Sequence, residues 1–367
     1  MPLKIAVIGH IRHAIEEPFM GGMEAHCASL VAGLEDAGHA VTLFAAPGSC
    51  AGNIVEICPA PYEDVLPWDR FHGTPSLERY QQLAFGQAWD VIRARNFDVV
   101  HNNSLFPPLI DRALEDGVPM VASQHVPPFG AMRAAVWRAA GSGSVQVTVP
   151  SRSQLPLWFD SPPDNLRVVY NGIDCAKWDC GAEHGDALVW FGRITPNKGL
   201  YEAVMAARAA GARLDIYGTI EEQTYFSERV RPFLDDTIRY RGHLSGERLR
   251  SAVCAARAVL VTPMWDEPFG LVAAEALAGS VPVIAFDRGA MREVVGDCGI
   301  IVPAGDIAAL GKAIGAIDAI DPSRCRTRAV ENFSLTAMIA GYEACYESAM
   351  EYAASASSLS RTHALLA

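Results

Sequence analysis

The chain has 367 residues, a formal net charge of −12, and a composition that is 50% hydrophobic and 20% charged. This length has room for two domains with separate cores, and the composition is typical of an α/β protein. The acidic balance and the lack of a basic face argue against a nucleic-acid partner. The sequence also shows no basic amphipathic helix of the kind that binds an anionic membrane. No signal peptide or membrane-length apolar run is visible, so we expect a cytoplasmic protein.

The nine cysteines are scattered and include no Cys-x-x-Cys pair. An odd number without a regular framework favours reduced, mostly buried thiols. Cys175 and Cys180 form the closest pair, and we assign them no function.

Short apolar segments alternate with helical patterns along the chain, which is typical of parallel, doubly wound sheets. We expect strands near residues 4–9, 41–46, 98–102, 120–124, 145–149, 166–170, 187–191, 213–217, 238–241, 258–262, 281–286 and 300–302. These strands are too many for one compact sheet, so two Rossmann-like domains are predicted, at 1–163 and 164–335, joined by a linker at 161–164. Residues 336–367 are expected to form a helix with a frayed tail from residue 353.

The segment 265–278 follows the apolar run 258–263, which is typical of a buried parallel strand. A helix is expected to begin near Gly270, and its first amides and its macrodipole favour a phosphate group. Glu267 lies before this helix and Glu275 inside it, roughly 10 Å apart along the axis. The two carboxylates are therefore placed to bind hydroxyl groups at the two ends of one ligand, with a diphosphate between them.

Arg193 and Lys198 lie five residues apart in a loop that follows the predicted strand at 187–191. Two cations at the carboxyl end of a strand suit a diphosphate, because arginine binds it through its planar fork and lysine as a point charge.

The spacing of Glu267 and Glu275, with Glu267-Pro268-Phe269-Gly270 at its start, resembles the glutamate pair of retaining glycosyltransferases of family 4. The resemblance covers nearly the whole chain, with its specific motifs concentrated in residues 190–300. It implies the GT-B fold, an α/β architecture in which two Rossmann-like domains with doubly wound parallel sheets face each other across a cleft. It also implies that the C-terminal helix returns to the N-terminal, acceptor-side domain, and that the second domain binds the sugar nucleotide.

The implied reaction transfers a sugar from a nucleoside-diphosphate sugar to a hydroxyl or amine of a small-molecule or glycan acceptor, which we expect to be soluble. The anomeric configuration is retained, and UDP-sugars are the favoured donors. The resemblance assigns Arg193 and Lys198 to the diphosphate and the leaving group, Glu267 to sugar hydroxyls and Glu275 to the ribose. His125 matches a family histidine near the transferred sugar, and completes the implied catalytic set of Arg193, Lys198, Glu267 and His125. The implied sugar-nucleotide-binding residues are Gly21, Gly22, Arg193, Lys198, His243, Leu244, Phe269, Gly270, Leu271 and Glu275.

Two stretches of the N-terminal half leave alternatives open. The Gly21-Gly22 pair permits close approach of backbone to a ligand, or forms a plain turn. In residues 59–76, several prolines are expected to prevent a regular element, and the aromatic residues Tyr62, Trp68 and Phe71 either contact a sugar acceptor or pack on the domain.

The chain departs from the family pattern at two positions. Thr219 precedes Ile220 where the family has a second glycine, which puts the geometry of the base-side loop in doubt. Ser280 occupies the position of a helix-ending glycine, where we expect a left-handed backbone at a cost of about 1 kcal/mol.

Two other functions remain open: a sugar-nucleotide epimerase or hydrolase of the same fold, and an inactive sugar-nucleotide-binding subunit. An oxidoreductase is disfavoured because the Gly-x-Gly-x-x-Gly fingerprint is absent. No Asp-x-Asp motif is present, so we expect no metal to carry the diphosphate and no cofactor besides the sugar nucleotide itself.

Overall fold

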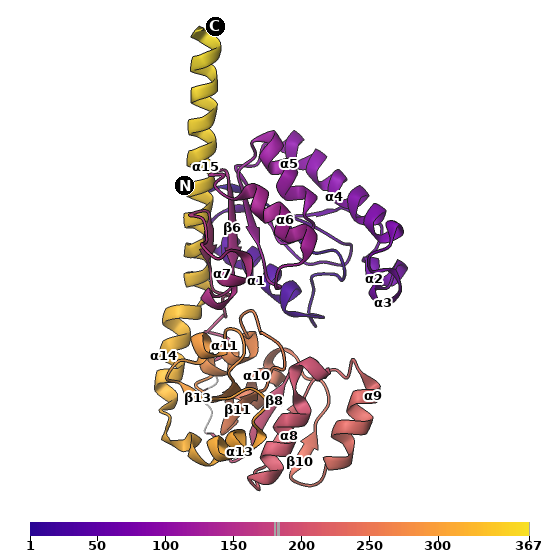
Figure 1. Ribbon diagram of the computed structural model, residues 1–367, viewed down its shortest axis with the longest axis vertical. Helices are drawn as coiled ribbons and strands as arrows, with labels where there is room; N and C mark the ends of the chain where they lie inside the picture. The colour runs from indigo at the N-terminus through magenta and orange to yellow at the C-terminus, as the bar shows by residue number, and fades with distance from the viewer. Residues whose placement is uncertain (180, 182–183, 367) are drawn as a thin grey trace. The chain divides into compact units, whose positions relative to one another are not determined.

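The computed structural model describes residues 1–179, 181 and 184–366, with side chains up to residue 355. The chain divides into two compact units (Figure 1). Unit 1 comprises Met1–Pro150, Gln154–Gly172 and Leu335–Ala367, and unit 2 comprises Ser151–Ser153 and Ile173–Ser334. Each unit is built around one parallel sheet, which confirms the predicted α/β class with two Rossmann-like domains.

The sheet of unit 1 has the order β3-β2-β1-β4-β5-β6-β7, and all its described pairs are parallel. Its strands are β1 (Lys4–Ile8), β2 (Ala40–Ala45), β3 (Ile54–Glu56), β4 (Val99–Asn102), β5 (Met120–Ser123), β6 (Val145–Val149) and β7 (Leu166–Val168). Its helices are α1 (Gly22–Asp36), α2 (Tyr62–Val65), α3 (Trp68–Phe71), α4 (Pro75–Arg95), α5 (Pro108–Asp116), α6 (Gly130–Ala139), α7 (Leu155–Trp158) and α15 (Leu335–Leu366).

Strand β1 shows how both faces of this sheet are covered. Successive side chains of a strand point to opposite faces, so Ala6 and Ile8 pack in a core with residues of α4, α5 and α6. Ile5 and Val7 pack in a second core with residues of α1 and α15. Figure 1 shows α4, α5 and α6 together on one side of unit 1 and the long α15 on the other. Burial on both faces explains why the central residues of β1 are apolar.

The sheet of unit 2 has the order β10-β9-β8-β11-β12-β13, again with parallel pairs. Its strands are β8 (Leu188–Phe191), β9 (Leu214–Tyr217), β10 (Ile238–Tyr240), β11 (Ala258–Val261), β12 (Val283–Phe286) and β13 (Gly299–Val302). Its helices are α8 (Leu200–Ala209), α9 (Gln223–Tyr225), α10 (Gly246–Cys254), α11 (Leu271–Ala278), α12 (Met291–Val295), α13 (Ile307–Ala316) and α14 (Pro322–Phe333). The central strands β8 and β11 meet where the chain order of the sheet reverses, and α/β sheets bind ligands beside such a point.

The division between the units differs from the predicted boundary after residue 163. Strand β7 pairs with β6 through Val147 and Leu166, so the first sheet extends beyond that boundary. The Val169 N–H also donates to the Val149 carbonyl at 3.0 Å. The chain leaves unit 1 only after Gly172, and the predicted linker at 161–164 lies within unit 1.

Three local predictions need correction. Residues 59–76 were expected to lack regular structure, but single-turn helices begin directly after Pro61 and Pro67, where proline lacks only an N–H that a first helical turn does not use. The tail from residue 353 was expected to be frayed, but α15 is helical to Leu366, consistent with the absence of glycine and proline from residues 353–366. Strand β3 was not predicted. Residue 367 lies outside the described residues.

The left-handed conformation predicted at Ser280 is confirmed, with φ of 62°. Its N–H donates to the Leu277 carbonyl at 3.0 Å, and the Val281 N–H donates to Ala276 at 2.9 Å. These bonds satisfy carbonyl groups at the end of α11 that the helix itself leaves open, which offsets the strain of a non-glycine residue.

Most described cysteines carry free thiols, and most of these are buried: Cys27, Cys50, Cys58, Cys175, Cys298, Cys325 and Cys345. Cys254 is disulfide-bonded, so the expectation of uniformly reduced thiols is wrong at that residue. Cys180, which was assigned no function, lies outside the described residues. Among the described helices, none combines the length and the apolar character that crossing a membrane requires.

Candidate functional site

The loop between β11 and α11 holds a carboxylate that is paired with a lysine. Lys198 Nζ lies 2.7 Å from Glu267 Oε2, and the Trp265 indole N–H donates to the same oxygen at 2.9 Å. Lys198 Nζ also lies 5.3 Å from the centre of the Trp265 ring, within the range of a cation–π interaction. Only 24% of the Lys198 side chain and 14% of the Glu267 side chain are exposed. Partial exclusion of water strengthens the attraction between the two charges, so each group fixes the position of the other.

A close approach of two backbone segments brings Lys198 to this loop. Gly199 has φ of 69°, and a Cβ atom there would lie 1.8 Å from the Thr262 carbonyl oxygen, so no other residue fits. The Thr262 hydroxyl donates to the Gly199 carbonyl at 2.8 Å, and the Met264 N–H donates to the Asn197 carbonyl at 2.8 Å. The loops that follow β8 and β11 are therefore joined along their lengths.

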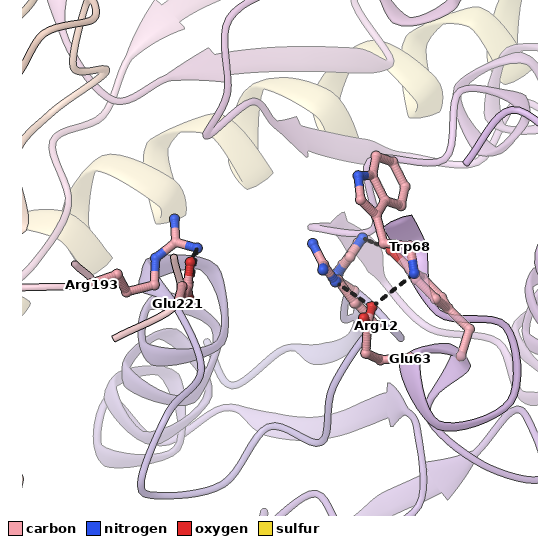
Figure 2. Close-up of polar contacts among 7 residues, drawn as sticks. Arg12, Glu63, Trp68, Arg193 and Glu221 are labelled. Carbon is pink, nitrogen blue, oxygen red and sulfur yellow. Dashed lines mark hydrogen bonds and ion pairs between the residues drawn. The ribbon is translucent and has the colours of Figure 1, made fainter. Parts of the chain in front are cut away.

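Arg193 follows β8 in the same loop as Lys198 but has a different carboxylate partner. Its Nη1 lies 3.2 Å from both carboxylate oxygens of Glu221, as Figure 2 shows. The pair is more exposed than the lysine pair, with 49% of the Arg193 side chain and 33% of the Glu221 side chain accessible. Glu221 lies in the loop after β9 that contains Thr219, the position where the chain departs from the family pattern.

Helix α11 begins after a left-handed glycine. Gly270 has φ of 88°, and the helix starts at Leu271, so its first amides have no acceptor within the helix. The Ala290 N–H donates to the Glu267 carbonyl at 2.9 Å and fixes the loop before the helix. A Cβ atom at Gly289 would lie 2.2 Å from that carbonyl oxygen, so a side chain there would displace the loop.

The side chain of Phe269 packs in the protein interior. Only 2% of the residue is exposed, and its ring meets that of Phe333 edge-on at a centroid distance of 5.5 Å. Any contact of this residue with a sugar nucleotide therefore has to come from its backbone.

Glu275, on α11, has a carboxyl group whose pKa burial raises to about 8. The residue keeps partial access to solvent. A pKa near 8 leaves the carboxyl mostly protonated at pH 7, so it both donates and accepts hydrogen bonds. A neutral carboxyl group of this kind suits the hydroxyl groups of a ribose.

His243 and Leu244, assigned to the nucleobase by resemblance, lie in the loop after β10, where His243 is exposed. This loop is joined to the loop after β9, because the Gly218 N–H donates to the Gly242 carbonyl at 3.0 Å. The Tyr240 hydroxyl donates to the Gly218 carbonyl at 2.8 Å. The two loops are therefore connected by hydrogen bonds, and Glu221 lies three residues beyond Gly218.

Glu293 and Ser151 form a structural anchor of this site that sequence reasoning did not find. Glu293 accepts the N–H groups of Arg152 and Ser153 at 2.9 and 3.2 Å, and Ser151 Oγ donates to the Pro268 carbonyl at 2.6 Å. The segment 151–153 is thus tied to the loop that carries Glu267. The sequence carries no signal for this contact, because it joins residues more than a hundred positions apart.

The N-terminal glycines lie in unit 1, at the start of α1. Gly21 caps the helix in an extended conformation, with φ of −163°, which any residue can adopt. A Cβ atom at Gly21 would come 3.1 Å from Glu24 Oε2, a flexible side-chain end. The backbone of Gly21 therefore does not itself demand glycine.

His125 belongs to a group of histidines near the carboxyl ends of β4 and β5. His125 Nε2 lies 3.2 Å from Asn103 Oδ1, and the rings of His26 and His125 lie 4.0 Å apart. His101 is fully buried between Tyr346, at 2.6 Å from Nδ1, and Ser123, at 2.8 Å from Nε2. Burial lowers the pKa of His101 to about 3 and that of His125 to about 4, so both rings are neutral at pH 7.

Several polar atoms around these histidines are buried without a hydrogen-bond partner in the described structure: His26 Nδ1, Asn103 Nδ2, Gln124 Oε1 and His125 Nδ1. Buried polar groups are normally satisfied, so these atoms are available to a water molecule or a ligand.

A second polar group of unit 1 joins the loop after β1 to helices α2 and α3. Arg12 Nε donates to Glu63 Oε2 at 2.8 Å, and the Trp68 N–H donates to the same oxygen at 3.3 Å (Figure 2). The Arg12 guanidinium lies 5.5 Å from the centre of the Trp68 ring, and the His72 ring lies 4.1 Å from it. Trp68 remains 37% exposed, whereas Tyr62 is fully buried. Of the aromatic residues of this segment, Tyr62 thus packs on the domain and Trp68 faces solvent.

The structure brings Lys198 and Glu267 into direct contact, and it places Gly270 directly before helix α11 and Leu271 and Glu275 on that helix. It places His125, Gly21 and Gly22 in unit 1. Within the described residues, no cluster of three or more His, Cys, Asp or Glu side chains is arranged to hold a metal ion.

Two family models match the chain, and together they span most of it. The model described as Glycosyltransferase Family 4 matches residues 20–177, and the model described as Glycosyl transferases group 1 matches residues 185–317. The chain is 27% identical over 297 residues to a glycogen synthase of Mycobacterium tuberculosis, covering 72% of this chain and 70% of that protein.

Solved structures agree with this assignment. AviGT4, a glycosyltransferase involved in avilamycin A biosynthesis, is 25% identical, with a TM-score of 0.74 over 95% of this chain and 98% of that chain. Alr3699/HepE from Anabaena, solved in complex with UDP-glucose, shares the fold with a TM-score of 0.71 at 16% identity, over 94% of this chain and 100% of that chain. The chain is therefore a glycosyltransferase of the family 4 type, with the GT-B fold.

Proposed function

We propose that this enzyme transfers a sugar from a nucleoside-diphosphate sugar to a hydroxyl or amine of a small-molecule or glycan acceptor, with retention of the anomeric configuration. The observation that carries the proposal is the hydrogen-bonded pair of Lys198 and Glu267 in the loops that lead to the start of α11. Cations, free amides and a carboxylate side by side match a ligand that has both phosphate groups and sugar hydroxyls.

In the proposed reaction the bond between the sugar and the diphosphate breaks, and negative charge develops on the diphosphate. Arg193, Lys198 and the first amides of α11 stabilise this charge. The acceptor oxygen or nitrogen forms the new bond on the same face of the sugar, and its proton passes to the departing diphosphate. Glu267 binds sugar hydroxyls and Glu275 the ribose. No protein carboxylate is required as a nucleophile.

UDP-sugars are our first choice of substrate. Alr3699/HepE, solved with UDP and UDP-glucose, supports this choice through its shared fold. For the acceptor, we propose contacts with unit 1, where the exposed ring of Trp68 and the unpaired atoms of the histidine group are available. An aromatic ring with an arginine and a carboxylate beside it suits a sugar, which has both apolar faces and hydroxyl groups.

Thermal unfolding with UDP, GDP, ADP and TDP and their sugars tests the proposal. A ligand that binds only the folded protein, at 100 times its dissociation constant, stabilises it by about 2.7 kcal/mol. We expect stabilisation by one nucleotide series, with UDP first. Stabilisation by none of them would contradict the proposal.

Turnover of the stabilising sugar nucleotide is then followed by NMR, with and without a panel of acceptors. Transfer should require an acceptor and give a product with the anomeric configuration of the substrate. Consumption of the sugar nucleotide at the same rate without any acceptor would instead indicate an epimerase or hydrolase.

A further inference from the structure

The ion pair of Arg193 and Glu221 differs in geometry from the two bidentate arginine pairs of the described structure. Arg138 with Asp111, and Arg257 with Asp318, each use two guanidinium nitrogens on two carboxylate oxygens, at 2.7–2.8 Å. Arg193 shares its single Nη1 between both oxygens of Glu221 at 3.2 Å. Such a pair lacks the two parallel bonds that make arginine–carboxylate contacts strong.

This geometry leaves most of the Arg193 guanidinium open. In the described structure, Nε and Nη2 of Arg193 make no hydrogen bond to protein. Arg193 can therefore bind a second anion through these donors, or exchange Glu221 for it at small cost, because exposed ion pairs contribute little to stability.

Glu221 is held beside Arg193 by the backbone and not only by charge. The Ile194 N–H donates to the Thr219 carbonyl at 2.8 Å, and the Glu222 N–H donates to the Ile194 carbonyl at 3.3 Å. Ile194 and Ile220 also form a parallel bridge. These contacts lie on both sides of Glu221 in the sequence, so the backbone that carries its carboxylate stays beside Arg193 whatever the guanidinium binds.

We propose that Glu221 is a positioning residue whose carboxylate competes with the substrate diphosphate for Arg193, and that it weakens the hold of the enzyme on the diphosphate product. This inference rests on the proposed function and concerns the same site. In the free enzyme Glu221 orients Arg193. When a diphosphate occupies the guanidinium, the fixed Glu221 carboxylate becomes a like-charged neighbour of the phosphates and favours product release.

The lysine pair does not show this behaviour. Lys198 and Glu267 are closer, more buried and supported by the Trp265 N–H. The two cations are thus expected to behave differently: Lys198 keeps its contact with Glu267, whereas Arg193 exchanges Glu221 for the diphosphate.

The test compares Glu221→Gln with Glu222→Gln, because Glu222 is the next residue, is also exposed, and makes no side-chain hydrogen bond in the described structure. Binding of UDP and of uridine is measured by calorimetry at low and moderate salt. We expect Glu221→Gln to bind UDP about two- to fivefold more tightly than wild type, with uridine affinity unchanged. Inhibition of the transfer reaction by UDP should strengthen by the same factor, and Glu222→Gln should resemble wild type.

The outcomes separate failure of this inference from failure of the proposed function. If the wild-type enzyme binds UDP and Glu221→Gln binds it equally or more weakly, the competition is disproved and the proposed function stands. A tightening shared by Glu222→Gln, or one that extends to uridine, would show a general charge or structural effect and also overturn the inference. If neither UDP nor GDP, ADP or TDP binds the wild-type enzyme, the proposed function fails and this inference fails with it.

Discussion

The carboxyl ends of the two sheets carry polar groups of opposite character. In unit 1, His101 and His125 are buried and neutral, with pKa values lowered to about 3 and 4. In unit 2, Lys198 is held in an ion pair. The histidine group of unit 1 is thus neutral and the candidate site of unit 2 is charged, although the loop after β1 of unit 1 also holds the ion pair of Arg12 and Glu63. Because a diphosphate needs cations and an acceptor hydroxyl does not, the proposed function assigns the diphosphate to unit 2 and the acceptor to unit 1.

Removal of the Lys198 charge in unit 2 should have the largest effect on the rate of the reaction. We expect Lys198→Ala to lower the maximal rate about 10²- to 10³-fold, because a fixed positive charge is lost where negative charge develops. Lys177→Ala is the matched control, since Lys177 pairs with Asp174 on the surface of the same unit. Steady-state turnover of the sugar nucleotide measures both variants. A change of less than threefold in Lys198→Ala would remove this residue from the catalytic set.

Acid should destabilise unit 1 through its buried histidines. The pKa of His101 is about 3 in the folded protein and 6.5 in the unfolded chain, so the unfolded chain binds more protons between these values. Stability is therefore lost as the pH falls below about 6.5, by at most about 1.4 kcal/mol per pH unit for each such histidine. Limited proteolysis at pH 7.5 and 5, with the fragments identified by mass, should show earlier cleavage of unit 1 at pH 5. Cleavage confined to unit 2 would contradict this expectation.

Glu275 should give unit 2 the opposite pH response. The pKa of Glu275 is about 8 in the folded protein and 4.5 in the unfolded chain, so the folded protein binds the extra proton. Its contribution to stability is full below about pH 4.5 and is lost as the pH rises to 8, by at most about 1.4 kcal/mol per unit. Glu275→Gln removes this dependence, which denaturant unfolding of both proteins at pH 5, 6.5 and 8 measures.

The same variant tests the assignment of the two glutamates. We expect Glu275→Gln to weaken nucleotide binding and to leave recognition of the transferred sugar intact. Reduced discrimination between sugars with unchanged nucleotide affinity would mean that the roles of Glu267 and Glu275 are reversed.

Substitution of the exposed Trp68 of unit 1 should have the smallest effect on the kinetics of the reaction. We expect Trp68→Ala to raise the Michaelis constant for the acceptor about three- to tenfold, with that for the sugar nucleotide unchanged, because only a stacking contact is lost. Trp137 is a matched control, since it is also exposed and also lies beside an arginine, at 5.0 Å from Arg133. Equal effects of Trp68→Ala and Trp137→Ala would point to stability and not to acceptor binding.

Much of the fold could be predicted because buried parallel strands are apolar on both faces and stand out in the sequence. The strand near residues 166–170 was predicted, but the sequence of one strand does not show which sheet it joins. The domain boundary was therefore placed after residue 163, before this strand, although the strand belongs to unit 1. Strand β3 was missed because it is only three residues long and half-buried. The left-handed Ser280 was found because a helix end imposes a specific backbone conformation.

The site was predictable to the extent that its residues follow strands and begin helices. Arg193, Lys198 and Glu267 follow strands, and Glu275 lies in the helix that begins after Gly270. The partners of these residues were not predictable. Glu221 meets Arg193 only through the conformation of a loop, and Glu293 meets Arg152 across more than a hundred residues, so neither contact leaves a local pattern in the sequence.

The central claim is that the charged edge of unit 2 binds the diphosphate of the sugar nucleotide. Hydrogen exchange of the full chain with and without UDP, read by mass spectrometry, tests it most directly. We predict that UDP gives its strongest protection in segments 193–199 and 266–275, and that Lys198→Ala removes most of it. Protection that is strongest around the histidines of unit 1, with segments 193–199 and 266–275 unchanged, would contradict the claim.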